Sequence, residues 1–217
     1  MPGRASARTQ RGRESRDRVL DTAIELFAAH GFAAVTMRAL GDAAGLDNSS
    51  LYRHFASKTE LANAVLDRVT AEVLDVLAPA LASPAEPTLV ALADAATAVA
   101  LYLFDRPHVA RLLMHWMMST GETNASFAVS VRADDTRRPT GRLVTLVSEW
   151  LARGMRAGEF RAYEDPEALV LLIGAVLLRP ATFGHLLASH EPKRSREKAR
   201  RAWARELRAA IRGAFGP

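Results

Sequence analysis

The spacing of apolar residues along the chain predicts helices and gives no sign of strands. Between about residues 17 and 30, Leu20, Ile24 and Phe27 recur at intervals of four and three residues, which places them on one face of an α-helix. Gly31 follows, and glycine suits the left-handed position at which helices commonly end. No stretch alternates with a period of two residues, so the sequence predicts an all-α protein with about nine helices.

Two short helices are predicted next. The first covers about Met37–Ala44, and Thr36 precedes it as a natural N-cap. The second begins after Asp47 or Asn48, either of which can cap it, and ends near Phe55. Together with the helix at 17–30, they predict a compact three-helix unit.

A fourth helix is predicted to begin at Ser57, where Ser57 and Glu60 have the spacing of a capping box. Its apolar face continues to about Ala78, and three prolines then interrupt the chain between residues 79 and 87. Five further helices are predicted at about 88–105, 108–118, 139–157, 165–189 and 193–214.

The helix pair at 37–55, with its short connection beginning at Gly45, predicts a helix-turn-helix motif. On a helical wheel Leu51 and Phe55 face the core, whereas Ser49 and Arg53 face outward. In this motif the second helix enters the major groove of DNA with its first residues at the base edges. A helical hairpin that only packs is the alternative, but its solvated face would carry more glutamate and lysine.

Polar side chains at the start of the second helix of the pair can reach bases, and those farther along can reach phosphates. This geometry predicts base contacts by Asn48, Ser49 and Ser50 and phosphate contacts by Tyr52, His54 and Lys58. It leaves Arg53 unassigned between base and phosphate.

The stretch from Arg18 to Leu61 resembles the DNA-binding domain of the TetR (tetracycline-repressor) family. Residues 51–61 match the family pattern Leu-Tyr-x-His-Phe-x-x-Lys-x-x-Leu at every fixed position. The resemblance implies an all-α homodimer that binds a palindromic operator in double-stranded DNA through two such units, most often as a ligand-responsive repressor. Geometry and resemblance together give the predicted DNA contacts Thr36, Arg38, Asn48, Ser49, Ser50, Tyr52, Arg53, His54 and Lys58.

The segment departs from the family pattern at three positions. Asp47 stands where serine or threonine is frequent, and a carboxylate repels phosphate, so we expect Asp47 to cap its helix and not to touch DNA. Ser49 replaces a frequent glycine. Gly41 replaces a typical alanine inside a helix, and the sequence offers no reason for it.

Composition narrows the class of protein. Apolar residues make up 49% of the chain, the net charge is +5, and cysteine is absent, which excludes disulfides and thiolate metal sites and fits the cytoplasm. The longest apolar run, Leu169–Leu178, is too short for a membrane span of about 20 residues. No phosphate-binding loop or metalloprotease motif occurs, so we expect neither an enzyme nor a cofactor.

The chain is predicted to divide into three parts. Residues 1–16 are rich in arginine and predict a disordered basic arm, either a passive tail or a DNA contact. Residues 17–61 form the helix-turn-helix domain, and residues 62–217 form a larger helical domain for regulation and dimerisation.

In the family the last two long helices pair with those of a second subunit, so the apolar faces near the end of the chain predict a dimer interface. The alternative is packing within one chain. The predicted interface residues are Leu169, Leu172, Ile173, Val176, Leu177, Trp203 and Leu207. The last helix also carries a basic stripe, which is either a solvated face or a second surface for nucleic acid or membrane.

Methionine and aromatic residues in the middle of the chain predict an apolar pocket for a small effector, with ordinary core as the alternative. The predicted pocket residues are Tyr102, Phe104, His115, Met118 and Trp150. An effector there would shift the helix at 57–78 and with it the DNA-binding unit. The alternative functions are a ligand-independent DNA-binding protein or activator of the same fold, and a helical adaptor without DNA affinity.

Overall fold

The computed structural model describes residues 3–83, 85–118, 137–162, 164 and 193–216. This part of the chain forms eight helices and contains no strand, which confirms the all-α prediction. The helices are α1 (Gly3–Ala34), α2 (Met37–Ala44), α3 (Asn48–His54), α4 (Lys58–Leu81), α5 (Leu89–Asp105), α6 (Pro107–Met118), α8 (Pro139–Arg156) and α10 (Lys193–Phe215). The helix predicted at 165–189 lies outside the described residues.

Helix α1 corrects the prediction of a disordered arm at residues 1–16, because the helix begins at Gly3 and not near Asp17. Arginine, alanine and glutamine in this segment are good helix formers, and the guanidinium of Arg16 lies 4.8 Å from the centre of the Phe55 ring. At its other end α1 is broken at Gly31, whose φ of 75° and ψ of 162° are open in practice only to glycine.

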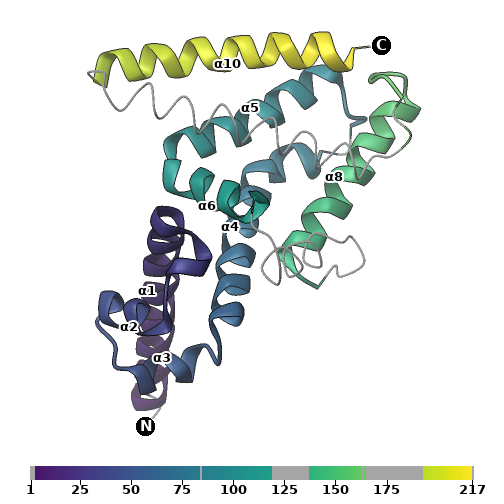
Figure 1. Cartoon of the computed structure of the whole chain (residues 1–217). Coiled ribbons are helices and arrows are strands. Elements are labelled where there is room, and N and C mark those ends of the chain that lie inside the picture. Colours follow the sequence, from purple (N-terminus) through teal and green to yellow (C-terminus); the bar gives the residue numbers. More distant parts are fainter. Residues whose placement is uncertain (1–2, 84, 119–136, 163, 165–192, 217) are drawn as a thin grey trace.

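Helices α1, α2 and α3 form a unit at one end of the molecule, which we call the head (Figure 1). Its centre is apolar and closed to solvent: Phe27, Leu40, Leu51 and Phe55 are each at most 1% exposed. The predicted inward face of α3 is therefore confirmed, and its other face is left to solvent.

Helix α4 leads from the head into the rest of the molecule (Figure 1). The Ser57 hydroxyl accepts the backbone N–H of Glu60 at 3.1 Å, and the Glu60 carboxylate accepts the N–H of Ala56 at 2.7 Å. The predicted capping box is present, although its carboxylate takes the N–H one residue before the N-cap. Pro79 does not end α4, because it lies in the last turn.

Helices α5, α6, α8 and α10 form the body, with α10 along α5 at the end opposite the head (Figure 1). The Arg208 guanidinium meets the Asp94 carboxylate at 2.7 Å, and Arg200 meets Asp105 at 3.0 Å. Leu207 is only 8% exposed, and Trp203 packs against the same core. Leu207 is therefore covered by its own chain, whereas part of the Trp203 surface stays exposed.

The other predicted dimer residues, Leu169, Leu172, Ile173, Val176 and Leu177, lie outside the described residues. None of the described helices is long and apolar enough to cross a membrane.

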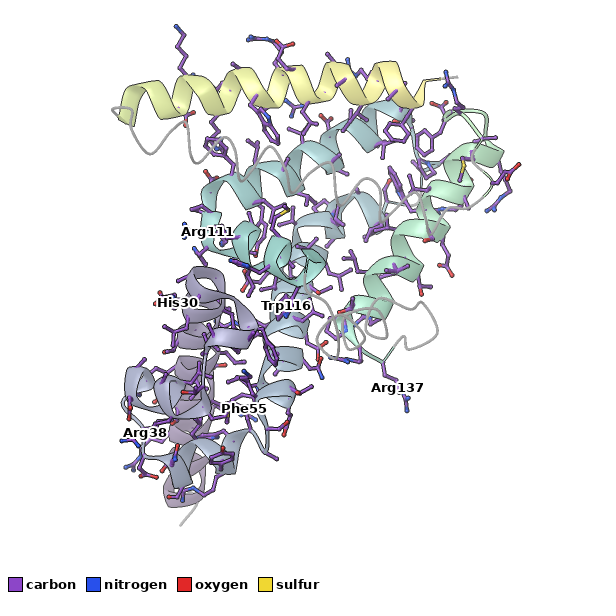
Figure 2. The ribbon with its side chains drawn as sticks, viewed as in Figure 1. His30, Arg38, Phe55, Arg111, Trp116 and Arg137 are labelled. Atoms are coloured by element: carbon purple, nitrogen blue, oxygen red, sulfur yellow. The ribbon has the colours of Figure 1, made fainter. Side chains whose placement is uncertain are left out.

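The head meets the body where α1 packs against α6 and α4. Figure 2 shows His30, at the end of the unbroken part of α1, near this junction, with Arg111 and Trp116 of α6 on the body side. A Cβ atom at Gly31 would lie 3.6 Å from Nδ1 of His115. The break in α1 is thus in contact with α6, and the same position joins the head to the body.

Candidate DNA-binding surface

The turn between α2 and α3 is compact because of two glycines. Gly45 has φ 68° and ψ 35°, the left-handed conformation that ends a helix, as the sequence predicts. The N–H of Leu46 donates to the Gly41 carbonyl at 2.9 Å. A Cβ at Gly41 would lie 3.1 Å from the Leu46 carbonyl oxygen, so alanine would require the turn to shift. The structure therefore supplies the reason for Gly41 that the sequence lacks.

The start of α2 presents two of the predicted contact residues. Thr36 is the N-cap, and its hydroxyl oxygen accepts the N–H of Ala39 at 3.1 Å, which leaves the hydroxyl proton available to a phosphate. Arg38 has an 85% exposed side chain and lies 3.9 Å from the Asp42 carboxylate. Figure 2 shows Arg38 at the outer edge of the head. Both side chains can contact DNA without disturbing the packing of the head.

The start of α3 is organised around Asp47. Its carboxylate oxygen Oδ1 accepts the N–H of Ser50 and the hydroxyl of Ser49, both at 2.7 Å. Its Oδ2 accepts the hydroxyl of Ser50 at 3.0 Å. Asp47 is therefore the N-cap, as expected from the sequence, and in addition it holds both serine side chains.

These hydrogen bonds also fix the charge of Asp47. The Ser49 hydroxyl and the N–H and hydroxyl of Ser50 lower the pKa of Asp47 from 3.8 to about 2. The carboxylate is consequently ionised at any pH at which the protein would work.

The remaining predicted contacts lie along the exposed side of α3. Tyr52 is 48% exposed, Asn48 is exposed at the first position of the helix, and His54 is half-buried at the last. The Nη2 group of Arg53 donates to the Ser50 hydroxyl oxygen at 2.7 Å. The structure thus brings the predicted contact residues of α3 together on the head, with Arg53 held beside the serines.

Lys58 differs from this group, because its ammonium points into the protein. It donates to the carbonyl oxygens of Phe32 at 3.0 Å, Ala33 at 3.4 Å and Val35 at 2.9 Å. It also lies 4.4 Å from the centre of the Phe32 ring. An ammonium has three N–H donors, so all three are in use, and a phosphate contact by Lys58 requires one of these bonds to be exchanged.

Sequence reasoning missed the two connections that shape this surface. An aspartate at an N-cap with serines two and three residues later is a local signal that predicts the hydrogen bonds of Asp47. The carbonyl acceptors of Lys58 lie 23 to 26 residues away along the chain, and no local pattern predicts them.

The residues predicted to form one effector pocket do not meet in one cavity of the described structure. Tyr102 lines a cavity of about 800 Å³ between α1, α4, α5 and α6, whereas Trp150 lines another of about 440 Å³. Phe104 is buried in the core, and His115 is exposed beside Gly31. The side chain of Met118 lies outside the described part.

The cavity beside Tyr102 is lined by both apolar and acidic side chains. Its lining consists of Asp21, Ile24, Glu25, Glu72, Asp75, Val76, Tyr102, Arg106, His108 and Val109. The Tyr102 hydroxyl donates to the Glu72 carboxylate at 2.7 Å, and burial together with this carboxylate raises the pKa of Tyr102. No cluster of three or more histidine, cysteine or acidic side chains suited to a metal occurs in the described part of the chain.

The amino-terminal part of the chain matches a known family model. Residues 19–65 match the model described as bacterial regulatory proteins, tetR family. This segment runs from the core of α1 through α2 and α3 into α4, and it contains every predicted DNA contact.

Two curated relatives and one solved structure extend the comparison. The chain is 30% identical over 153 residues to the transcriptional regulatory protein RaaS of Mycobacterium tuberculosis, covering 70% of this chain and 62% of RaaS. It is 45% identical over 51 residues to the transcriptional repressor KstR2 of Rhodococcus jostii, covering 24% of this chain and 25% of KstR2. Its fold is similar to that of the regulator FadR of Bacillus subtilis in complex with stearoyl-CoA, with a TM-score of 0.68, 13% identity, and coverage of 89% of this chain and 96% of FadR.

Proposed function

Because this chain belongs to the tetR family of bacterial regulatory proteins, we propose that it is a transcriptional repressor that binds operator DNA through α2 and α3. The proposal rests on the exposed polar side chains on the outer face of the head. Arg38, Asn48, Ser49, Tyr52 and Arg53 lie exposed there, while Leu51 holds the same short helix to the core. In this proposal the chain is a regulator and not an enzyme, and it acts in the cytoplasm, where operator DNA is found.

The operator is a palindrome in this proposal, and two copies of the chain bind it as a homodimer. Two recognition helices must then enter successive major grooves about 34–36 Å apart on one face of the duplex. A footprint with two protected half-sites about one helical turn apart supports this arrangement, and a single half-site contradicts it.

We further propose that a small effector releases the protein from DNA by binding in the cavity beside Tyr102. FadR, which has the same fold, holds stearoyl-CoA, so the fold is able to take a ligand. The cavity touches α1 of the head, α4, and the body. Its carboxylates favour a ligand with hydrogen-bond donors as well as apolar surface, which adds a polar requirement to the apolar effector that the sequence predicts.

The contacts around this cavity connect the ligand to the head. Arg68 of α4 bonds the Asp21 carboxylate of α1 at 2.9 Å and lies 3.8 Å from Glu72, which in turn accepts the hydroxyl of Tyr102. A ligand that displaces Tyr102 from Glu72 would alter the partners of Arg68 and thereby the hold of α4 on α1. Coupling energies between such sites are typically about 1–3 kcal/mol.

Gel retardation with the DNA upstream of the protein's own gene tests the proposed function. We expect retardation that weakens steeply as salt rises, because several phosphates are engaged. A variant that replaces Asn48, Tyr52 and Arg53 by alanine keeps the buried face of α3 and should lose the complex. No salt-sensitive retardation at any operator candidate would instead favour a helical adaptor without DNA affinity.

The effector proposal has its own test. A compound screen for release from the operator is repeated with Val76→Phe, which fills part of the cavity. A compound that releases the parent protein but not the variant supports the site, and one that releases both equally places the effector elsewhere.

A further inference from the structure

The two serines at the start of α3 have no hydroxyl proton to offer DNA. A serine hydroxyl carries one proton and two lone pairs. The proton of Ser49 goes to Oδ1 of Asp47 and that of Ser50 to Oδ2 of Asp47. What remains for a ligand is therefore the lone pairs of two oxygen atoms.

This orientation cannot reverse while Asp47 is ionised. An ionised carboxylate only accepts hydrogen bonds, and the bonds from Ser49 and Ser50 hold the pKa of Asp47 near 2. Ser50 also accepts a bond from Arg53 at 2.7 Å, which uses one of its two lone pairs. Ser49 keeps both lone pairs, and its side chain is exposed.

We propose that Asp47 is a specificity-determining residue that never touches DNA: it fixes Ser49 and Ser50 as hydrogen-bond acceptors, so that the start of α3 selects bases that present an amino group. This inference rests on the proposed function, since it applies to a helix that enters the major groove. The chemical group recognised is an exocyclic amino group, which cytosine carries at N4 and adenine at N6.

The same orientation rejects the other two bases at that position. Guanine presents N7 and O6 and thymine presents O4, all acceptors, and these would face the serine lone pairs without a proton between them. A polar pair left without a hydrogen bond in this way weakens binding about tenfold. The donors of Arg53 lie beside the serines, so a neighbouring acceptor on the DNA is accommodated by the arginine and not by the serines.

Asp47→Asn separates this role from that of the helix cap. Asparagine is as good an N-cap as aspartate, and its carbonyl oxygen can still accept the N–H of Ser50. Its amide group, however, donates hydrogen bonds. The carbonyl takes the place of Oδ1 and keeps the bonds from the Ser50 N–H and the Ser49 hydroxyl, and the amide takes the place of Oδ2 beside the Ser50 hydroxyl. Ser50 then accepts from the amide, and its own proton turns outward. The variant should fold like the parent protein but offer DNA a donor as well as an acceptor.

The experiment selects preferred duplexes from a random DNA pool with the parent protein, Asp47→Asn and Ser49→Ala. We expect the parent to enrich cytosine or adenine at one fixed position of each half-site. Removing that base's amino group, with a pyrimidinone in place of cytosine or purine in place of adenine, should weaken parent binding about five- to tenfold, the value of one hydrogen bond. The two analogues decide which base is read.

With Ser49→Ala the penalty for removing the amino group should fall to about twofold or less. With Asp47→Asn, in which Ser50 offers a proton, the pool should also enrich guanine or thymine at the base that Ser50 faces. Ser49→Ala leaves the bond from Ser50 to the cap intact, so it keeps the test valid if the asparagine variant proves unstable in thermal unfolding. An unchanged penalty in Ser49→Ala together with unchanged base selection by Asp47→Asn overturns the inference, as does enrichment of guanine or thymine by the parent protein at the position where Ser49→Ala changes the selection. Failure of the parent protein to enrich any sequence overturns the proposed function itself and is a distinct outcome.

Discussion

The ammonium nitrogen of Lys58 lies 2.9 Å from the carbonyl oxygen of Val35. This bond joins the first residue of α4 to the segment between α1 and α2, and two further carbonyls, those of Phe32 and Ala33, accept from the same ammonium. Lys58 therefore holds the start of α4 to the end of α1 and to the segment that leads into α2.

Replacing Lys58 by methionine should destabilise the protein. The variant keeps much of the apolar length of the side chain but leaves three carbonyls without their donor, so we expect the free energy of unfolding to fall by about 1–3 kcal/mol. Urea denaturation measures the change. Lys198→Met, on the exposed side of α10, is the matched control and should change stability by less than about 0.5 kcal/mol. Unchanged stability with weaker operator binding would mean that Lys58 acts at the phosphates instead.

Unlike Lys58, Tyr52 should matter for DNA binding and not for stability. Its side chain is 48% exposed, so Tyr52→Ala should change the free energy of unfolding by less than about 0.5 kcal/mol. We expect operator affinity to fall about fivefold, the value of one phosphate hydrogen bond. Tyr52→Phe removes only the hydroxyl, and equal losses in both variants would assign the effect to that group. A large drop in melting temperature for either variant would show a structural role.

Gly154 of α8 should not tolerate a side chain. A Cβ there would lie 2.1 Å from the ring of Phe160, which is buried and packs 5.8 Å from Trp150 between ring centres. Gly154→Ala should therefore cost about 1–3 kcal/mol of stability. Gly213→Ala is the control, because no atom lies within 4 Å of a Cβ at Gly213 in α10. That change should leave stability equal or raise it by about 0.5–1 kcal/mol.

Because Asp47 caps α3, a small part of the free energy of unfolding should depend on pH in the acidic range. The folded protein holds the pKa of Asp47 at about 2, below its ordinary value of 3.8. A lowered folded pKa gives stability that is present above about pH 4 and is lost as the pH falls towards 2. Asp47→Asn removes this titration. The free energy of unfolding of the variant relative to that of the parent should therefore rise as the pH falls from about 4 towards 2. Parallel stability curves from pH 5 to pH 2 would contradict the assignment.

Local capping explains how much of the fold could be predicted. The start of α2 at Thr36, the positive φ at Gly31 and Gly45, and the cap at Asp47 each depend on a few neighbouring residues. These signals are readable in the sequence, and the fold of the head followed from them. The helical start of α1 was missed because arginine-rich composition predicts disorder, although the same residues have high helix propensity.

What the sequence could not supply is the identity of packing partners. The apolar stripe of α10 is evident in the sequence, but a stripe does not say whether α5 or a second subunit covers Leu207. In the same way Tyr102 and Trp150 have the composition of pocket residues, yet they line different cavities. For the DNA-binding surface the outward residues of α3 were predictable from helical periodicity, whereas the inward turn of Lys58 was not.

In the proposed response to an effector, helix α4 would act as a lever. It has 24 residues and joins the head at one end to the body along the rest of its length. Such a helix is about 36 Å long, so tilting it by about 5° around its far end would displace its start by about 3 Å. That displacement approaches the spacing of adjacent base pairs. If an effector acts at Tyr102 as proposed, a rearrangement no larger than the loss of one hydrogen bond there would be magnified along this helix, and the length of the helix would set how small a change the DNA-binding surface could report.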